Sequence, residues 1–176
     1  MSWKFGGIYI KKNEEMSVTA LLDRLQLSLS PTGQWVNLDN VTSTLFYKTA
    51  IGDYQGITLI HNNFLPYDCA FEPGKIYEFD KILCAASNKM DILCFFLDGI
   101  TSSYGISLFS YGNRIRCRGV MSNQLVLDEG DLLPMEKDIT NMDEENRIIY
   151  VISDFLDISF KDLLEDNSLL LEIYSD

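Results

Sequence analysis

Residues 104–120 read YGISLFSYGNRIRCRGV, and this stretch decides the fold. Two β-rich runs, 104–111 and 114–120, are separated only by Gly112 and Asn113. Two-residue hairpin turns need positive φ angles, which glycine and asparagine tolerate better than other residues. The spacing therefore predicts an antiparallel hairpin with its turn at Gly112 and Asn113.

The rest of the chain extends this hairpin into a sheet. Further β-like runs are 3–12, 41–49, 56–61, 91–97, 124–128 and 147–152, and 169–174 is either a strand or a helix. Helical spacing of apolar residues predicts helices that follow Ser17, cover 78–88 and cover 159–164. Neither an internal repeat nor a Pro- or Gly-rich linker divides the chain. We predict a single α+β domain over residues 1–176, mainly antiparallel β-sheet with two or three helices.

Charge is distributed unevenly along the 176 residues. The net charge is −12, yet residues 1–121 hold 11 basic and 11 acidic residues and form a neutral body. The acidic last third, 122–176, holds 3 basic and 15 acidic residues. Such a run is either a solvated surface or an acidic face that steers a basic protein partner. Nucleic acid is an unfavourable partner for this third because its phosphates would be repelled.

Composition and cysteine usage bound the remaining function classes. An apolar content of 47% and an aromatic content of 12% are typical of a compact globular protein. We expect a cytoplasmic protein with no membrane association, because there is no 18-residue apolar run and no signal-like start. The four cysteines form no CxxC pair and are expected to be free thiols. One histidine, His61, supplies too few ligands for zinc, so no metal and no cofactor is expected.

Three arginines form the one constellation that suggests a site. Arg114, Arg116 and Arg118 alternate with Ile115 and Cys117. Because strand side chains alternate between faces, the three arginines should share one face, with Ile115 and Cys117 in the core. The candidate binding residues are Phe109, Tyr111, Arg114, Arg116 and Arg118 on this face, with the acidic run Asp143, Glu144 and Glu145. The arginines are either paired with internal carboxylates or open to a partner protein or to nucleic acid.

The segment LFSYGNRIRCRGV (108–120), followed by EGDLLPMEKDI (129–139), resembles small bacterial cytosolic proteins. In those proteins a sheet hairpin leads to a G-x-x-L-P-x-E element, represented here by Gly130, Leu133, Pro134 and Glu136. Several acidic proteins of that kind are regarded as immunity or antidote proteins against toxins. The resemblance implies a binding role and transfers no catalytic residue.

Three functions follow, in order of preference. The first is a non-catalytic protein-binding domain, with an acidic immunity-type inhibitor as its most concrete version. The alternative is a hydrolase or transferase that uses a carboxylate pair whose position the sequence does not reveal. The third is a sheet face that binds nucleic acid through the arginines.

Overall fold

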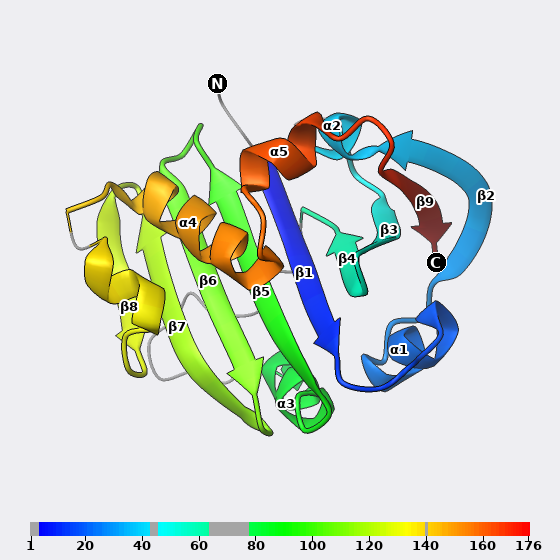
Figure 1. Ribbon diagram of the computed structural model, residues 1–176, viewed down its shortest axis with the longest axis horizontal. Helices are drawn as coiled ribbons and strands as arrows, with labels where there is room; N and C mark the ends of the chain where they lie inside the picture. The colour runs from blue at the N-terminus through cyan, green and yellow to red at the C-terminus, as the bar shows by residue number, and fades with distance from the viewer. Residues whose placement is uncertain (1–3, 43–45, 64–77, 140) are drawn as a thin grey trace.

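A computed structural model of the protein describes residues 4–42, 46–63, 78–139 and 141–176. These residues form one nine-stranded sheet in the order β2-β9-β3-β4-β1-β5-β6-β7-β8, and every neighbouring pair is antiparallel (Figure 1). The strands are β1 (Lys4–Lys12), β2 (Ser30–Asn37), β3 (Thr49–Tyr54), β4 (Ile57–His61), β5 (Met90–Asp98), β6 (Ser103–Ser110), β7 (Asn113–Met121), β8 (Gln124–Glu129) and β9 (Leu170–Ser175). The predicted α+β class with a mainly antiparallel sheet is confirmed.

The described residues contain more helices than the two or three that the sequence predicts. There are five α-helices and one 3-10 helix, η2. Their bounds are α1 (Val18–Arg24), α2 (Leu38–Val41), α3 (Glu78–Ala86), η2 (Pro134–Asp138), α4 (Glu144–Leu156) and α5 (Phe160–Glu165). None of the helices in the described ranges is long and apolar enough to cross a membrane.

Helix α4 replaces the strand that was predicted over 147–152. The helix begins after Asp143 because the Asp143 carboxylate caps it, accepting a hydrogen bond from the backbone N–H of Asn146 at 3.0 Å. Apolar residues then recur every three or four positions and are buried: Ile148, Val151, Ile152 and Phe155. The β-branched residues that suggested a strand are therefore the inner face of an amphipathic helix.

The strand predicted over 41–49 is absent from the described part of that range. Helix α2 ends at Val41, and strand β3 begins only at Thr49.

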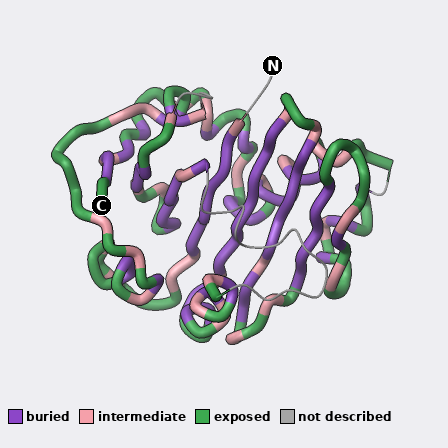
Figure 2. Tube along the Cα trace, turned by 180° about the vertical axis from the view of Figure 1, so that it is seen from behind, coloured by how far each residue is buried: buried purple, intermediate pink, exposed green. Residues whose placement is uncertain are grey.

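The sheet separates two hydrophobic cores. Helices α4 and α5 cover one face together with η2, whereas α1 and α3 lie behind the other (Figure 1). Tyr9 of β1 belongs to the core under α4, and its neighbours Ile8 and Ile10 belong to the core under α1 and α3. The central strands are consequently buried along most of their length, while the edge strand β2 is largely exposed (Figure 2).

Candidate functional site

The hairpin of β6 and β7 is present, but its turn lies one residue earlier than predicted. Ser110 pairs with Asn113, so Tyr111 and Gly112 are the two turn residues. Their φ angles are +50° and +78°, as a type I′ turn requires. Gly112 also donates its backbone N–H to Ser87 Oγ at 3.1 Å, which anchors the turn to the end of α3. Tyr111 is left 85% exposed at the tip.

A β-bulge in β7 divides the three arginines between the two faces of the sheet. Phe109 pairs with Arg114 and Leu108 pairs with Arg116, so Ile115 is an extra residue in β7. The expectation that all three arginines share a face is therefore wrong. Ile115 is 38% exposed rather than in the core, whereas Cys117 is buried as predicted.

Arg116 and Arg118 lie under α4, and Arg114 points to the α3 side. Arg114 contacts Asp80 of α3 at 3.3 Å and Glu129 of β8 at 2.8 Å. Phe109 is also buried on the α3 side of the sheet, in the same core as Cys117. The bulge thus decides which carboxylates each arginine meets.

Arg116 is the centre of a buried ion-pair network. Its Nε donates to Glu136 Oε2 at 2.7 Å, and its Nη2 donates to Glu136 Oε1 at 2.9 Å. The Nη1 atom donates to Asp128 Oδ1 at 2.6 Å. Burial alone would lower the pKa of Arg116, but the hydrogen bonds to Glu136 and Asp128 outweigh it and raise the pKa. The guanidinium therefore joins β7 to β8 and η2.

Arg118 continues the network to α4. It makes a two-point contact with Glu144, at 2.9 Å from Nε and 2.6 Å from Nη2. Its Nη1 also donates to Asp128 Oδ2 at 2.5 Å. Hydrogen bonding to Glu144 raises the pKa of Arg118 against the opposing effect of burial. All three arginines are thus bonded to carboxylates of this chain, which is the internal-pairing alternative that the sequence left open.

The acidic run at 143–145 forms the first turn of α4 and its cap. Asp143 caps the helix, and hydrogen bonds from Asn146 lower the pKa of Asp143. Glu144 is bonded to Arg118, and Glu145 accepts a hydrogen bond from the Tyr104 hydroxyl at 3.4 Å. Each of these acids therefore has a structural contact within the chain.

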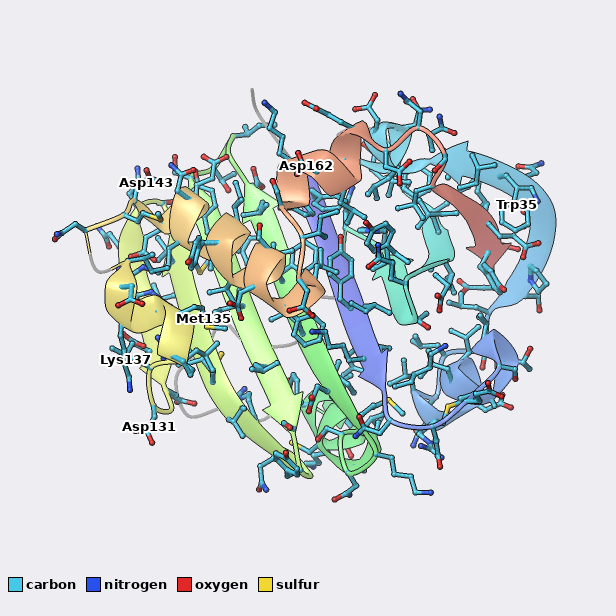
Figure 3. All side chains as sticks on the ribbon, in the orientation of Figure 1. Trp35, Asp131, Met135, Lys137, Asp143 and Asp162 are labelled. Atoms are coloured by element: carbon cyan, nitrogen blue, oxygen red, sulfur yellow. The ribbon has the colours of Figure 1, made fainter. Side chains whose placement is uncertain are left out.

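Other acidic residues lie on the outer side of α4 and α5 with little compensation. We call them the acidic helical face: Asp154, Asp157, Asp162 and Glu165, all exposed. Asp162 points outward from α5, away from the sheet (Figure 3). The basic neighbours in the described residues are Lys161, 3.7 Å from Glu165, and Lys11, 2.9 Å from Asp157. The sequence could indicate this face only as part of the acidic last third.

A groove of about 300 Å³ adjoins the acidic helical face. It lies between α4, η2 and the strands β1, β5, β6 and β7. Residues from six elements and three connecting segments line it, including Leu93, Leu108, Ile115, Met135, Phe155 and Asp91. No sequence motif marks these residues, because they come from strands and helices far apart in the chain.

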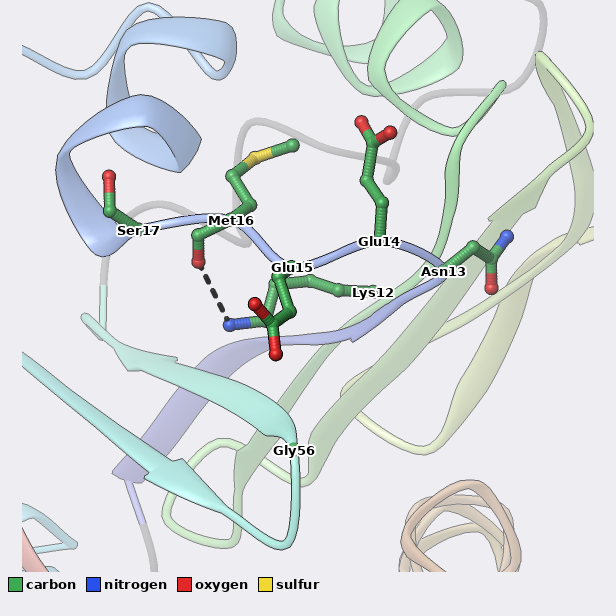
Figure 4. Close-up of a pocket in the computed structure, with 7 residues that line it drawn as sticks. All are labelled: Lys12, Asn13, Glu14, Glu15, Met16, Ser17 and Gly56. Atoms are coloured by element: carbon green, nitrogen blue, oxygen red, sulfur yellow. Dashed lines mark hydrogen bonds between the residues drawn. The ribbon is translucent and has the colours of Figure 1, made fainter.

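A second, wider hollow lies beside the segment that links β1 to α1 (Figure 4). Consecutive residues 12–17 form most of its wall. Lys12 donates to the backbone carbonyl of Met16 at 3.4 Å, and Glu14 lies 3.6 Å from Arg24 and 3.4 Å from Lys89. The charged groups that line this hollow are largely engaged in holding the segment, so it offers little to a ligand.

The single histidine is buried inside the core under α4. The Tyr9 hydroxyl lies 3.3 Å from His61 Nε2, and the Phe5 ring stacks on the imidazole at a centroid distance of 4.7 Å. Burial lowers the pKa of His61 to about 3. The imidazole is therefore neutral near pH 7 and out of reach of a substrate.

No known family, curated protein or solved structure matches this chain.

Proposed function

We propose that the protein is a non-catalytic binding domain for a basic protein, of the immunity or antidote type. The observation that carries the proposal is the acidic helical face, where four exposed carboxylates meet few basic side chains. An exposed face of one sign attracts a partner of the opposite sign and raises the association rate. It contributes little to folding, since exposed charges rarely do.

The enzyme alternative has weaker support. A general acid that works near neutral pH needs a raised pKa. Three carboxyl groups in the described ranges have pKa values that depart clearly from normal, namely Asp128, Asp143 and Asp166, and all three are lowered. These three groups are therefore ionised near neutral pH and are not candidates for a general acid.

The nucleic-acid alternative depended on an open arginine face. Arg116 has a side chain with 0% exposure, and Arg118 has one with 10% exposure. Both guanidiniums already bind carboxylates, so a phosphate would have to displace Glu136, Asp128 or Glu144. This leaves the acidic helical face as the better-supported surface.

The proposal is tested by affinity capture from a native cell extract, followed by kinetics with the purified partner. The test variant carries Asp154→Asn, Asp157→Asn, Asp162→Asn and Glu165→Gln. A matched control removes four exposed charges elsewhere through Glu15→Gln, Asp23→Asn, Asp39→Asn and Glu78→Gln. We expect the partner to be basic and its association at low salt to slow by about tenfold or more in the test variant.

The control variant should associate nearly as fast as the wild type. Equal slowing in both variants would mean that only the total charge matters. The proposal would be contradicted if the test variant captured the partner as well as the wild type does, or if the partner were not basic.

A further inference from the structure

The groove beside the acidic helical face has an apolar floor. Leu93 of β5 and Val151 of α4 are fully buried beneath it, and Leu108 of β6 lies partly exposed between them. Phe155 closes the side toward the end of α4. Leu108 is the floor residue that meets water, and water in contact with it is released at a gain in free energy when an apolar group replaces it.

Exposed apolar side chains continue this floor to the surface. Ile115, the bulged residue of β7, is 38% exposed, and Tyr111 at the hairpin tip is 85% exposed. Met135 of η2 also lines the groove (Figure 3). Aromatic residues and methionine are over-represented where proteins bind one another. The groove is therefore open to a side chain from outside.

The charges around the groove are mostly negative. Asp91, Asp154 and Asp157 line it, and Lys11 is its one cation among the described residues. Lys11 is held by Asp157 at 2.9 Å and lies over the Phe155 ring at 5.1 Å from the centroid. Asp91 accepts a hydrogen bond from the Ser110 hydroxyl, and Asp154 makes no ion pair within the described residues. The groove thus carries uncompensated negative charge above an apolar floor.

We propose that the groove receives one apolar side chain, flanked by lysine or arginine, from the basic protein that the acidic helical face attracts. This inference rests on the proposed function and names the part of the partner that docks. A volume of about 300 Å³ is at the small end of ligand pockets and suits a side chain. The carboxylates would bind the flanking cations, and the floor would bury the apolar group.

Charge complementarity argues against the other occupants. A second copy of this chain carries a net charge of −12 and would bring like charge to the groove. An anionic membrane surface or a phosphate would be repelled for the same reason. A cationic, partly apolar segment complements both the carboxylates around the groove and its apolar floor.

The test follows backbone amide chemical shifts of the isotope-labelled protein during titration with capped peptides. The first peptide has one leucine between two pairs of lysines. The second replaces leucine by serine, and the third replaces every lysine by glutamate. We expect shifts around Ser110, Ile115, Met135 and Phe155 with the first peptide, and none of comparable size with the other two.

Two variants with matched controls locate the binding. Ile115→Ser and Asp154→Asn should each weaken the first peptide by about fivefold or more, the usual effect of losing an interface anchor. Leu125→Ser on β8 and Asp39→Asn after β2 remove comparable exposed groups elsewhere and should leave its affinity unchanged. Equal binding of the leucine and serine peptides, or shifts that avoid the groove, would overturn the inference.

Further arms separate the remaining occupants. If phenethylammonium binds as tightly as the leucine peptide, the groove is a site for a small amine and the inference is overturned. The inference is also overturned if the protein forms a dimer that the Ile115→Ser substitution dissociates. If the leucine peptide does not bind but partner capture still depends on the acidic helical face, only the inference about the groove is contradicted. If the leucine peptide binds and partner capture is unchanged by the substitutions in that face, the proposed function is contradicted instead.

Discussion

Arg116 and Glu136 are joined by two hydrogen bonds, at 2.7 and 2.9 Å, and neither side chain has any exposed surface. Glu136 Oε2 also accepts the backbone N–H of Leu133 at 2.9 Å, so the same carboxylate shapes the start of η2. The pair connects the hairpin strand β7 to the segment that leads into α4.

Removing Arg116 should therefore destabilise the protein strongly. In Arg116→Ala we expect a loss of about 3–5 kcal/mol in the free energy of unfolding, because Glu136 is left buried without its counter-charge. The measurement is urea unfolding followed by circular dichroism. The double variant Arg116→Met with Glu136→Leu removes both charges and should lose less than Arg116→Ala alone. Additive losses in the double variant would show that the pair is not coupled.

His61 should make stability depend on pH between pH 7 and pH 5, above the range in which aspartate and glutamate side chains normally titrate. Its pKa is about 3 in the folded protein, so the unfolded chain, with a pKa near 6.5, binds a proton that the folded protein rejects. The stabilising contribution is complete above pH 6.5 and falls as the pH decreases toward 3. We expect a loss of about 2 kcal/mol between pH 7 and pH 5, measured by urea unfolding.

His61→Gln provides the control for this effect. It retains a polar group near Tyr9 but does not titrate, so its stability should change little from pH 7 to pH 5. A wild-type curve that is flat over this range would mean that the folded protein accommodates the charged imidazole.

Gly130 should tolerate alanine less well than other glycines with positive φ. Its φ is +85°, and an added Cβ would lie 2.2 Å from the backbone carbonyl oxygen of Ile115. Gly33 has a φ of +71° but no heavy atom within 4 Å of an added Cβ. Gly33→Ala should cost about 1 kcal/mol from backbone strain alone. Gly130→Ala should cost clearly more by thermal unfolding, and equal losses would contradict the close approach of the two segments.

The cap of α4 is a fourth measurable feature. Asp143→Ala should lower the free energy of unfolding by about 1 kcal/mol, because the backbone N–H of Asn146 loses its partner. Asp143→Ser should recover most of this loss, since a serine hydroxyl is also a good cap. Asp154→Ala, on the outer side of the same helix, should change stability by less than about 0.5 kcal/mol. A similar loss at both positions would indicate a general charge effect on α4.

The sequence alone determined the elements whose signals are local. Ser17 caps α1, where its Oγ accepts the backbone N–H of Ala20 at 3.2 Å. Gly112 indicated the hairpin because glycine tolerates the positive φ of the turn, although the other turn residue is Tyr111 and not Asn113. The runs that became β1, β5, β6, β7 and β8 were recognisable from their apolar and β-branched content. The class and the antiparallel character of the sheet follow from these signals.

Only the tertiary structure decided which charges meet. The bulge at Ile115 places the Arg114 and Arg116 side chains on opposite faces of the sheet. The amino-acid composition of a strand does not reveal such a one-residue change of register. The partners Asp80, Glu136 and Glu144 lie 34, 20 and 26 residues from their arginines. Local backbone preferences act over a few residues, whereas these pairs depend on how α3, η2 and α4 pack on the sheet. The groove is a product of the same packing, because its lining residues come together only when α4 and η2 pack on the sheet.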